Sequence, residues 1–121
     1  MTATTEANVV RQLAPSGVLR AAINFGNPVL AQRDPDGGDP RGVSVDLARE
    51  IARRLGVAVQ FVPYDAAGKV FEALHSAAWD VAFLAIDPKR ATEIEFTAPY
   101  VIIEGSYMVP QSSPLRTIAD V

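Results

Sequence analysis

Apolar residues recur with a helical period in some parts of the chain and form short unbroken runs in others. Spacings of three and four residues predict an amphipathic helix over Ser44–Leu55, which Gly56 should end. The same pattern, less complete, predicts shorter helices over Glu6–Leu13 and Lys69–Ala77. These three segments place one apolar face each against whatever forms the rest of the core.

Short apolar runs rich in β-branched residues predict buried strands. The three clearest runs are Val18–Ile23, Val57–Val62 and Val81–Ala85. Pro63 should end the second strand, and the Asp87-Pro88 pair after the third favours a helix over residues 88–94, because Asp caps helices and Pro suits their first turn. Weaker patterns suggest two further strands, over Phe96–Tyr100 and Ile102–Val109.

The order in which these elements alternate predicts an α/β fold, with three layers (αβα) and a mostly parallel sheet. Ligands of such sheets bind beside the carboxyl ends of the strands. We therefore expect three connections to converge there: Asn24–Pro28, Pro63–Gly68 and Ala85–Arg90. The long Asn24–Gly42 connection contains an Asp- and Gly-rich part that lacks the closing Glu of a calcium loop, so turns are expected instead.

Composition excludes several classes of protein. The 121 residues suit one domain, and a net charge of −3 without a basic stripe argues against nucleic-acid binding. No apolar run approaches the roughly 18 residues of a membrane span. The absence of Cys excludes disulfides, thiolate metal sites and a Cys nucleophile. The first residues, Met1–Glu6, lack the features of a signal peptide, so the chain as written would stay in the cytoplasm.

Candidate chemistry centres on Arg90, which follows the Asp87-Pro88 pair. A cation beside a helix N-terminus favours a bound anion, and a carboxylate matches the guanidinium fork. The alternatives are an ion pair with Glu93 or Glu95, or exposure to solvent. For Asp46, Trp79, Asp80 and the single histidine, His75, structural or surface roles are expected, so no catalytic residue and no metal ligand is predicted.

Five segments, in order, resemble motifs of the periplasmic amino-acid-binding proteins of ABC importers. They are Gly17–Ala22, Gly42–Arg49, Leu74–Val81, Ile86–Ala91 and Phe96–Tyr100. The resemblance implies the first lobe of a type II periplasmic binding protein. It divides the chain into an N-terminal helix (1–16), a solute-binding lobe (17–103) and a crossover with the start of a second lobe (104–121).

The resemblance also implies a function and a place for it. It implies a receptor lobe, not an enzyme, that binds a small carboxylate or amino acid and needs no cofactor. The lobe would act in the periplasm and serve the membrane permease of an ABC importer. Arg90 looks like the residue that clamps the ligand carboxylate. The positions similar to the family's other ligand contacts are Asn27, Phe83, Ala85 and Asp87, of which Ala85 and Asp87 replace the usual hydroxyl residues.

Two alternatives remain at this point. Because family members look about twice as long, the chain resembles a truncated half-receptor, in which closure of the cleft would be lost. In such a half, the segment Ser106–Val109 could fill the empty slot of the sheet either by folding back within one chain or by exchange with a second copy, which would give a structural, dimerising module. A dehydratase-like enzyme on the same fold is the other alternative.

Overall fold

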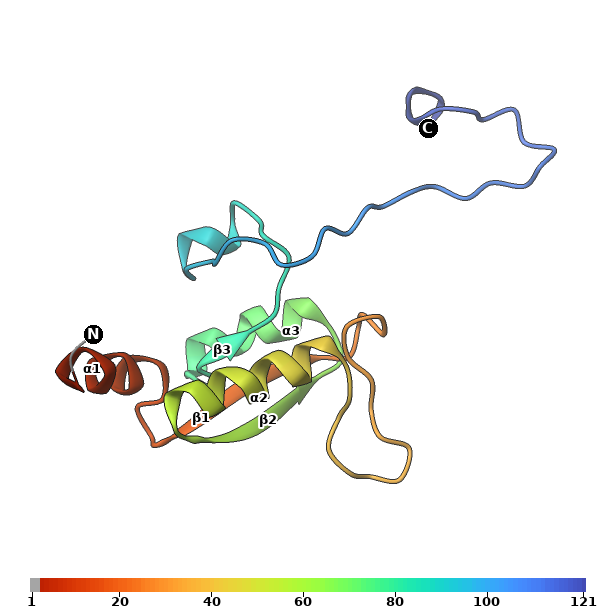
Figure 1. The fold of residues 1–121 in the computed structure, drawn as a ribbon. Coiled ribbons are helices and arrows are strands. Elements are labelled where there is room, and N and C mark those ends of the chain that lie inside the picture. The colour runs from red at the N-terminus through yellow and green to blue at the C-terminus, as the bar shows by residue number, and fades with distance from the viewer. Residues whose placement is uncertain (1–2) are drawn as a thin grey trace.

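The computed structural model describes residues 3–121 and contains three strands and three α-helices (Figure 1). Their bounds are α1 Ala3–Leu13, β1 Val18–Asn24, α2 Val43–Leu55, β2 Ala58–Tyr64, α3 Ala67–Glu72 and β3 Val81–Ala82. Three 3-10 turns complete the fold: η1 Ala73–Ser76, η2 Arg90–Thr92 and η3 Ile118–Asp120.

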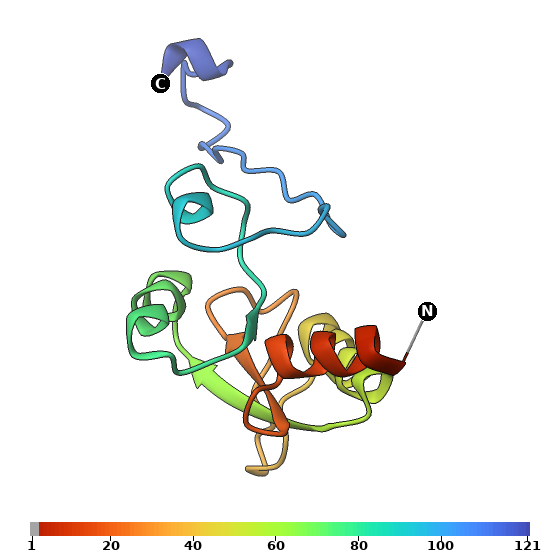
Figure 2. The ribbon, with the colours of Figure 1, turned by 90° about the vertical axis from the view of Figure 1, so that its left-hand side faces the viewer.

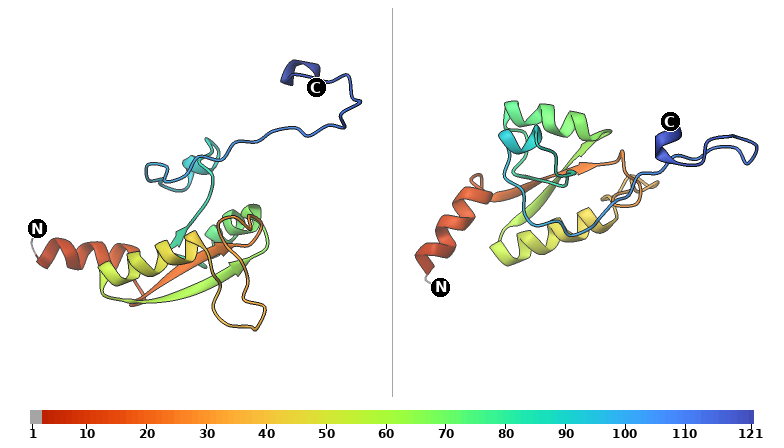
Figure 3. Two further views of the ribbon diagram at one scale, coloured as in Figure 1. Left: turned by 45° about the vertical axis from the view of Figure 1, so that its right-hand side comes forward. Right: turned by 90° about the horizontal axis from the view of Figure 1, so that it is seen from above.

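The strands form one parallel sheet in the order β2-β1-β3, so β1 lies in the centre. Helix α2 covers one face of this sheet and α3 covers the other, as the view from above shows (Figure 3). Viewed from the side, α1 extends from the α2 side of the sheet (Figure 2). The predicted α/β fold with a three-layer arrangement is therefore confirmed.

The core lies between β1 and α2 because alternate residues of β1 point to that helix. Leu19 is fully buried with Ala14 and Ala52, and Ile23 is fully buried with Ala31 and Val45. Each buried Leu or Ile contributes roughly 1.5–3 kcal/mol relative to exposure. The period read from Ser44–Leu55 thus identified the helix that supplies the main apolar partner of the sheet.

Glycines fix both ends of α2. Gly42 begins the helix at φ +129°, and a Cβ there would lie 2.4 Å from the carbonyl oxygen of Leu30. Gly56 ends it in the left-handed conformation (φ 72°), which L side chains rarely adopt. The helix therefore stops where the sequence predicted.

The prediction that Pro63 ends the second strand is wrong, because β2 continues to Tyr64 and Pro63 pairs with Ile23 of β1. A proline inside a central strand would remove a ladder hydrogen bond. Strand β2 lies at the edge of the sheet, where a missing N–H that points outward costs nothing.

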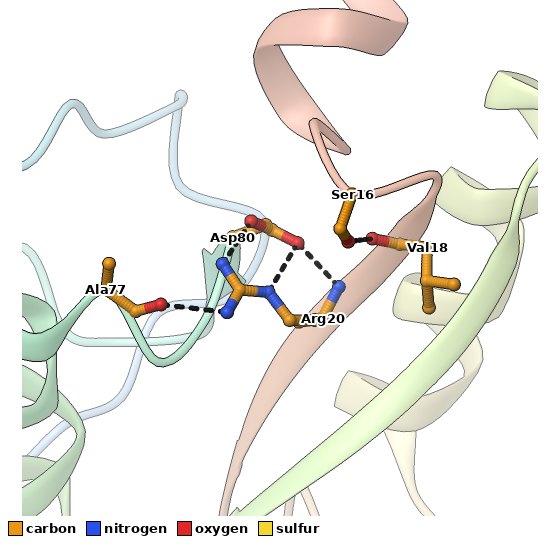
Figure 4. A network of polar contacts seen from close by, with 5 residues as sticks. All are labelled: Ser16, Val18, Arg20, Ala77 and Asp80. Atoms are coloured by element: carbon orange, nitrogen blue, oxygen red, sulfur yellow. Dashed lines mark hydrogen bonds and ion pairs between the residues drawn. The ribbon is translucent and has the colours of Figure 1, made fainter.

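A carboxylate joins β3 to β1 (Figure 4). The Asp80 side chain, 6% exposed, accepts hydrogen bonds from the Arg20 backbone N–H (2.8 Å), from Nε (3.2 Å) and from a terminal guanidinium nitrogen (2.9 Å). The other terminal nitrogen donates to the carbonyl of Ala77 at 2.8 Å. The hydrogen bond with Asp80 raises the pKa of Arg20. Asp80 thus has the structural role expected from the sequence.

After residue 82 the structure departs from the predicted elements. Strand β3 covers Val81–Ala82 only, and the helix expected over 88–94 is the short η2 turn. The segments 96–100 and 102–109 form no strand, and Ile102 and Met108 are 83% and 96% exposed. Apolar composition alone cannot produce a strand, because a strand needs a hydrogen-bonded neighbour and the outer edge of β3 has none here.

Asp80→Asn should destabilise the fold, because it removes the charge from a nearly buried group that accepts three hydrogen bonds. We expect the unfolding midpoint to fall by roughly 5–10 °C in thermal denaturation followed by circular dichroism. Asp36→Asn makes the same chemical change in an exposed turn and should shift the midpoint by less than about 2 °C. Equal midpoints for the two variants would contradict the role given to Asp80.

Glu50 should make stability depend on pH at the acid end. Hydrogen bonds from Arg53 and Arg54 lower the pKa of the Glu50 carboxyl to about 2 from an ordinary value of 4.5. Because the folded pKa is depressed, this stabilisation is present above pH 4.5 and is lost as the pH falls toward 2. Urea midpoints of Glu50→Gln should therefore fall less steeply over this range than those of the parent. Glu72→Gln, the same substitution away from Arg53 and Arg54, should keep the parental slope.

Candidate functional site

The turn after β3 is built by Asp87. Its carboxylate accepts hydrogen bonds from the backbone N–H groups of Lys89 (2.9 Å) and Arg90 (3.2 Å), and its carbonyl accepts one from Ala91 (2.9 Å). These bonds satisfy donors at the start of η2, as a capping Asp does. The sequence therefore located the cap correctly but overestimated the helix that follows it.

The guanidinium of Arg90 is half-exposed and donates one hydrogen bond, to the carbonyl of Ala85 at 3.2 Å. Among the side chains of residues 7–121, no carboxylate forms an ion pair with it. Glu93, one of the two expected competitors, instead contacts His75 Nε2 at 3.1 Å. Most of the N–H donors of Arg90 are thus available to an anion, because a guanidinium carries five.

Phe83 belongs to the core as well as to the start of this segment. Its ring packs against the cluster of Ile23, Ala31 and Val45, and it meets the ring of Tyr100 edge to face, with centroids 6.3 Å apart and planes at 88°. Phe83 therefore anchors the segment that carries Arg90.

Asn27 lies in the connection after β1. Its side-chain oxygen accepts from the backbone N–H of Val29 (3.1 Å), and its carbonyl accepts from Leu30 and Ala31. The connections after β1 and β2 are joined by a hydrogen bond from the Phe25 N–H to the Tyr64 carbonyl (2.9 Å). These contacts hold the first two connections together at the carboxyl edge of the sheet.

The third connection does not converge on the first two. Phe83 packs against the cluster that includes Ala31 of the loop after β1, but beyond it the segment that carries η2 rises from the sheet on the α3 side, away from that loop (Figures 1 and 3). Hydrogen bonds join Ala85 and Asp87 to Arg90, whereas in the described part of the chain Asn27 bonds to Val29, Leu30 and Ala31 and not to these residues. The expectation that all three connections share one rim is met by two of them.

Two arginines that sequence analysis did not single out lie beside strand β2 and the connection that follows it. The guanidinium of Arg33 stacks over the ring of Phe25 at 4.2 Å and pairs with Asp65 at 2.8 Å. Arg49 lies over the ring of Phe61 at 5.3 Å. Such contacts join residues far apart in the chain, so no local sequence signal could have revealed them.

No group of three or more His, Asp or Glu side chains in the described part of the chain lies close enough to hold a metal ion. The residues described also contain no helix that is long and apolar enough to cross a bilayer.

Comparison with known proteins identifies the family. Residues 19–118 match the bacterial extracellular solute-binding proteins, family 3. The chain belongs to this family. The resemblance seen in the five sequence motifs is therefore confirmed, and the family is a binding-protein family. No curated protein matches the chain.

The solved structures that resemble this chain match it over a single lobe. The arginine-bound form of domain 1 from TmArgBP is 30% identical with a TM-score of 0.63, and the match covers 74% of this chain and 71% of that one. An ancestral arginine-binding protein bound to glutamine is 34% identical, with a TM-score of 0.62 and coverage of 70% and 38%. An ancestral cyclohexadienyl dehydratase is 28% identical, with a TM-score of 0.65 and coverage of 76% and 38%. The chain thus spans well under half the length of the two longer relatives.

Proposed function

We propose that residues 17–103 form a solute-binding lobe that recognises a small carboxylate or amino-acid-like ligand through Arg90. The Arg90 guanidinium, which has no carboxylate partner among residues 7–121, carries this proposal, because a bidentate carboxylate would satisfy N–H donors that have no partner in that part of the chain. Family membership supports a solute as the ligand. It also supports an extracellular or periplasmic location and delivery of the solute to the permease of an ABC importer.

The other predicted residues take separate roles in this proposal. The Asp87 cap fixes the turn, and the Ala85 carbonyl orients the guanidinium. Phe83 places the segment against the core, and its ring edge offers an apolar contact to the ligand. Asn27 contacts the ligand only if the Arg90 segment approaches the first connection.

One lobe covers one side of a small ligand, so affinity should depend on charge-assisted bonds more than on burial. The similarity to domain 1 of TmArgBP, which is described in an arginine-bound form, supports binding by a lobe of this kind. We place residues 104–121 outside the lobe, as the crossover to a second one. In that arrangement, cleft closure would come from chain beyond this lobe.

We favour binding over catalysis, although one relative is a dehydratase. The only histidine, His75, has a side chain that is 67% exposed and is paired with Glu93, whose side chain is 42% exposed. Solvent at such a pair screens the electrostatic effects on which acid–base catalysis depends. Turnover of a cyclohexadienyl acid by the purified chain would instead favour the enzyme.

Arg90→Gln should weaken binding of the ligand. We expect calorimetric titration with arginine, glutamine, glutamate and small dicarboxylic acids to find a saturable ligand for the parent, and the variant to lose roughly 10- to 100-fold in affinity. Lys89→Gln is the matched control, since it removes a neighbouring exposed cation from the same turn and should change affinity less than about threefold. Saturable binding that Arg90→Gln leaves intact would refute the role of Arg90.

The exposed apolar tail supports a second proposal, that two copies exchange the strand Ser106–Val109. Tyr107 and Met108 are 68% and 96% exposed, and the outer edge of β3 offers unpaired backbone groups. A strand of a second copy added at that edge would cover both features and give a two-fold dimer.

Light scattering after gel filtration should then give twice the 12.9 kDa of one chain, about 26 kDa. Met108→Pro should shift the mass toward the monomer because proline removes a ladder donor. Gln111→Pro, in the linker after this strand, should leave the dimer intact. A parent protein that elutes only at the monomer mass would reject the exchange.

A further inference from the structure

A hollow of about 560 Å³ lies between the long loop after β1 and the edge strand β2. Its apolar floor includes Val59 and Phe61, beneath which Ile23 is fully buried, and Arg33 and Arg49 contribute to its walls. Volumes of roughly 300–1,000 Å³ are typical of sites for small organic ligands. No residue of the Arg90 turn lines the hollow, and the segment that carries η2 lies on the α3 side of the sheet (Figure 3).

Each of the two arginines is stacked on an aromatic ring. Arg33 lies 4.2 Å from the centroid of Phe25, and Arg49 lies 5.3 Å from that of Phe61. Stacking holds a guanidinium plane in place while its second face and its remaining N–H groups stay accessible. The side chains of Arg33 and Arg49 are 58% and 47% exposed, so a ligand can reach both.

The carboxylates nearby are already engaged, some of them weakly. Asp65 pairs with Arg33 at 2.8 Å, whereas Asp39 and Asp46 reach Arg49 only at 3.3 and 4.0 Å. Asp39 is 73% exposed. Exposed ion pairs are weak, so a ligand carboxylate can replace Asp39 on Arg49 at little cost. Arg49 is therefore the better anchor for an incoming anion.

The tip of the loop is shaped by its glycines. The Gly37 N–H donates to the Asp34 carbonyl at 3.0 Å, and Gly37 itself has φ +81°. A Cβ on Gly38 would lie 2.4 Å from Asp34 Oδ2, while Asp34 Oδ1 accepts from the Asp36 N–H at 3.0 Å. Asp34, the other acidic residue that lines the hollow besides Asp39, thus holds the turn through its hydrogen bonds. The wall opposite β2 therefore has a defined shape.

We propose that this hollow is a second binding site, which takes an aromatic carboxylate. The carboxylate binds the guanidinium of Arg49, with Arg33 adding charge from the loop, and the aromatic ring lies on the floor formed by Val59 and Phe61. A planar ring suits this position because it contacts the apolar floor and the guanidinium faces at once. The site does not rest on the function proposed for Arg90.

The test is a titration of the full 121-residue chain, labelled with nitrogen-15, with benzoate followed by backbone NMR. We expect saturable shifts at Gly37, Gly38 and Gln60, which line the hollow. Cyclohexanecarboxylate, with the same charge and no aromatic ring, and benzyl alcohol, with no charge, should each bind at least about fivefold more weakly.

Variants then separate this site from the other one. Arg49→Gln should weaken benzoate binding by at least about fivefold, whereas Arg53→Gln, the same change one helical turn further along α2, should not. Arg90→Gln should leave the benzoate-induced shifts at Gly37, Gly38 and Gln60 unchanged, whatever it does to shifts at the Arg90 turn. The proposal is overturned if benzoate produces no saturable shifts, if the shifts centre on Ala85–Arg90, if Arg53→Gln weakens binding as much as Arg49→Gln, or if cyclohexanecarboxylate binds equally well.

Discussion

The position of β3, and of everything after it, depends on the contact between Asp80 and Arg20. Strand β3 pairs with β1 through two residues only, Val81 and Ala82. So short a ladder gives little cooperativity, whereas the Asp80 carboxylate adds three accepted hydrogen bonds and the Asp80 N–H donates a fourth to the Arg20 carbonyl at 2.8 Å. The same guanidinium holds Ala77, so the end of η1 and the start of β3 are placed together.

Local stability should therefore decrease from β1, in the centre of the sheet, to β3 at its edge and then to the segment that follows β3. Strand β1 has a strand on each side and a helix on each face, while β3 has one neighbour and the segment after it has fewer contacts still. The Arg90 segment is held by the Phe83–Tyr100 ring contact and by the exposed His75–Glu93 pair. A binding turn at the least stable end of a domain is common, because ligand-binding loops need freedom to adjust.

Local sequence signals predicted the elements whose causes are local. The period of Ser44–Leu55, its flanking glycine and the Asp87 cap all appear in the structure within a residue or two. The errors arose where the outcome depends on neighbours. Pro63 stays in its strand because that strand is at an edge, and the run after Ala82 forms no strand because nothing pairs with it.

The residues that form the candidate sites divide in the same way. Asp87 and Arg90 lie three positions apart, so their cooperation in one turn was readable from the sequence. Arg33 and Asp65 are 32 positions apart, and Arg20 and Asp80 are 60 apart, so no spacing rule connects them. The convergence of the three connections failed for a similar reason, since parallel topology fixes where strands end but not the path of the chain beyond them.

The arginines of this lobe show how the partner of a guanidinium separates structural from binding roles. The guanidinium of Arg20 donates its hydrogen bonds to Asp80 and Ala77, so Arg20 has a structural role. Arg33 and Arg49 are held by aromatic rings and by exposed carboxylates, which a ligand can displace. Arg90 has a single carbonyl partner and no carboxylate among residues 7–121, so an anion gains more there than at Arg20, Arg33 or Arg49, each of which already contacts a carboxylate. A lobe that encloses little of a ligand must rely on N–H donors that have no partner within the protein. For that reason Arg90 is a stronger candidate than Arg33 or Arg49 for binding the main ligand.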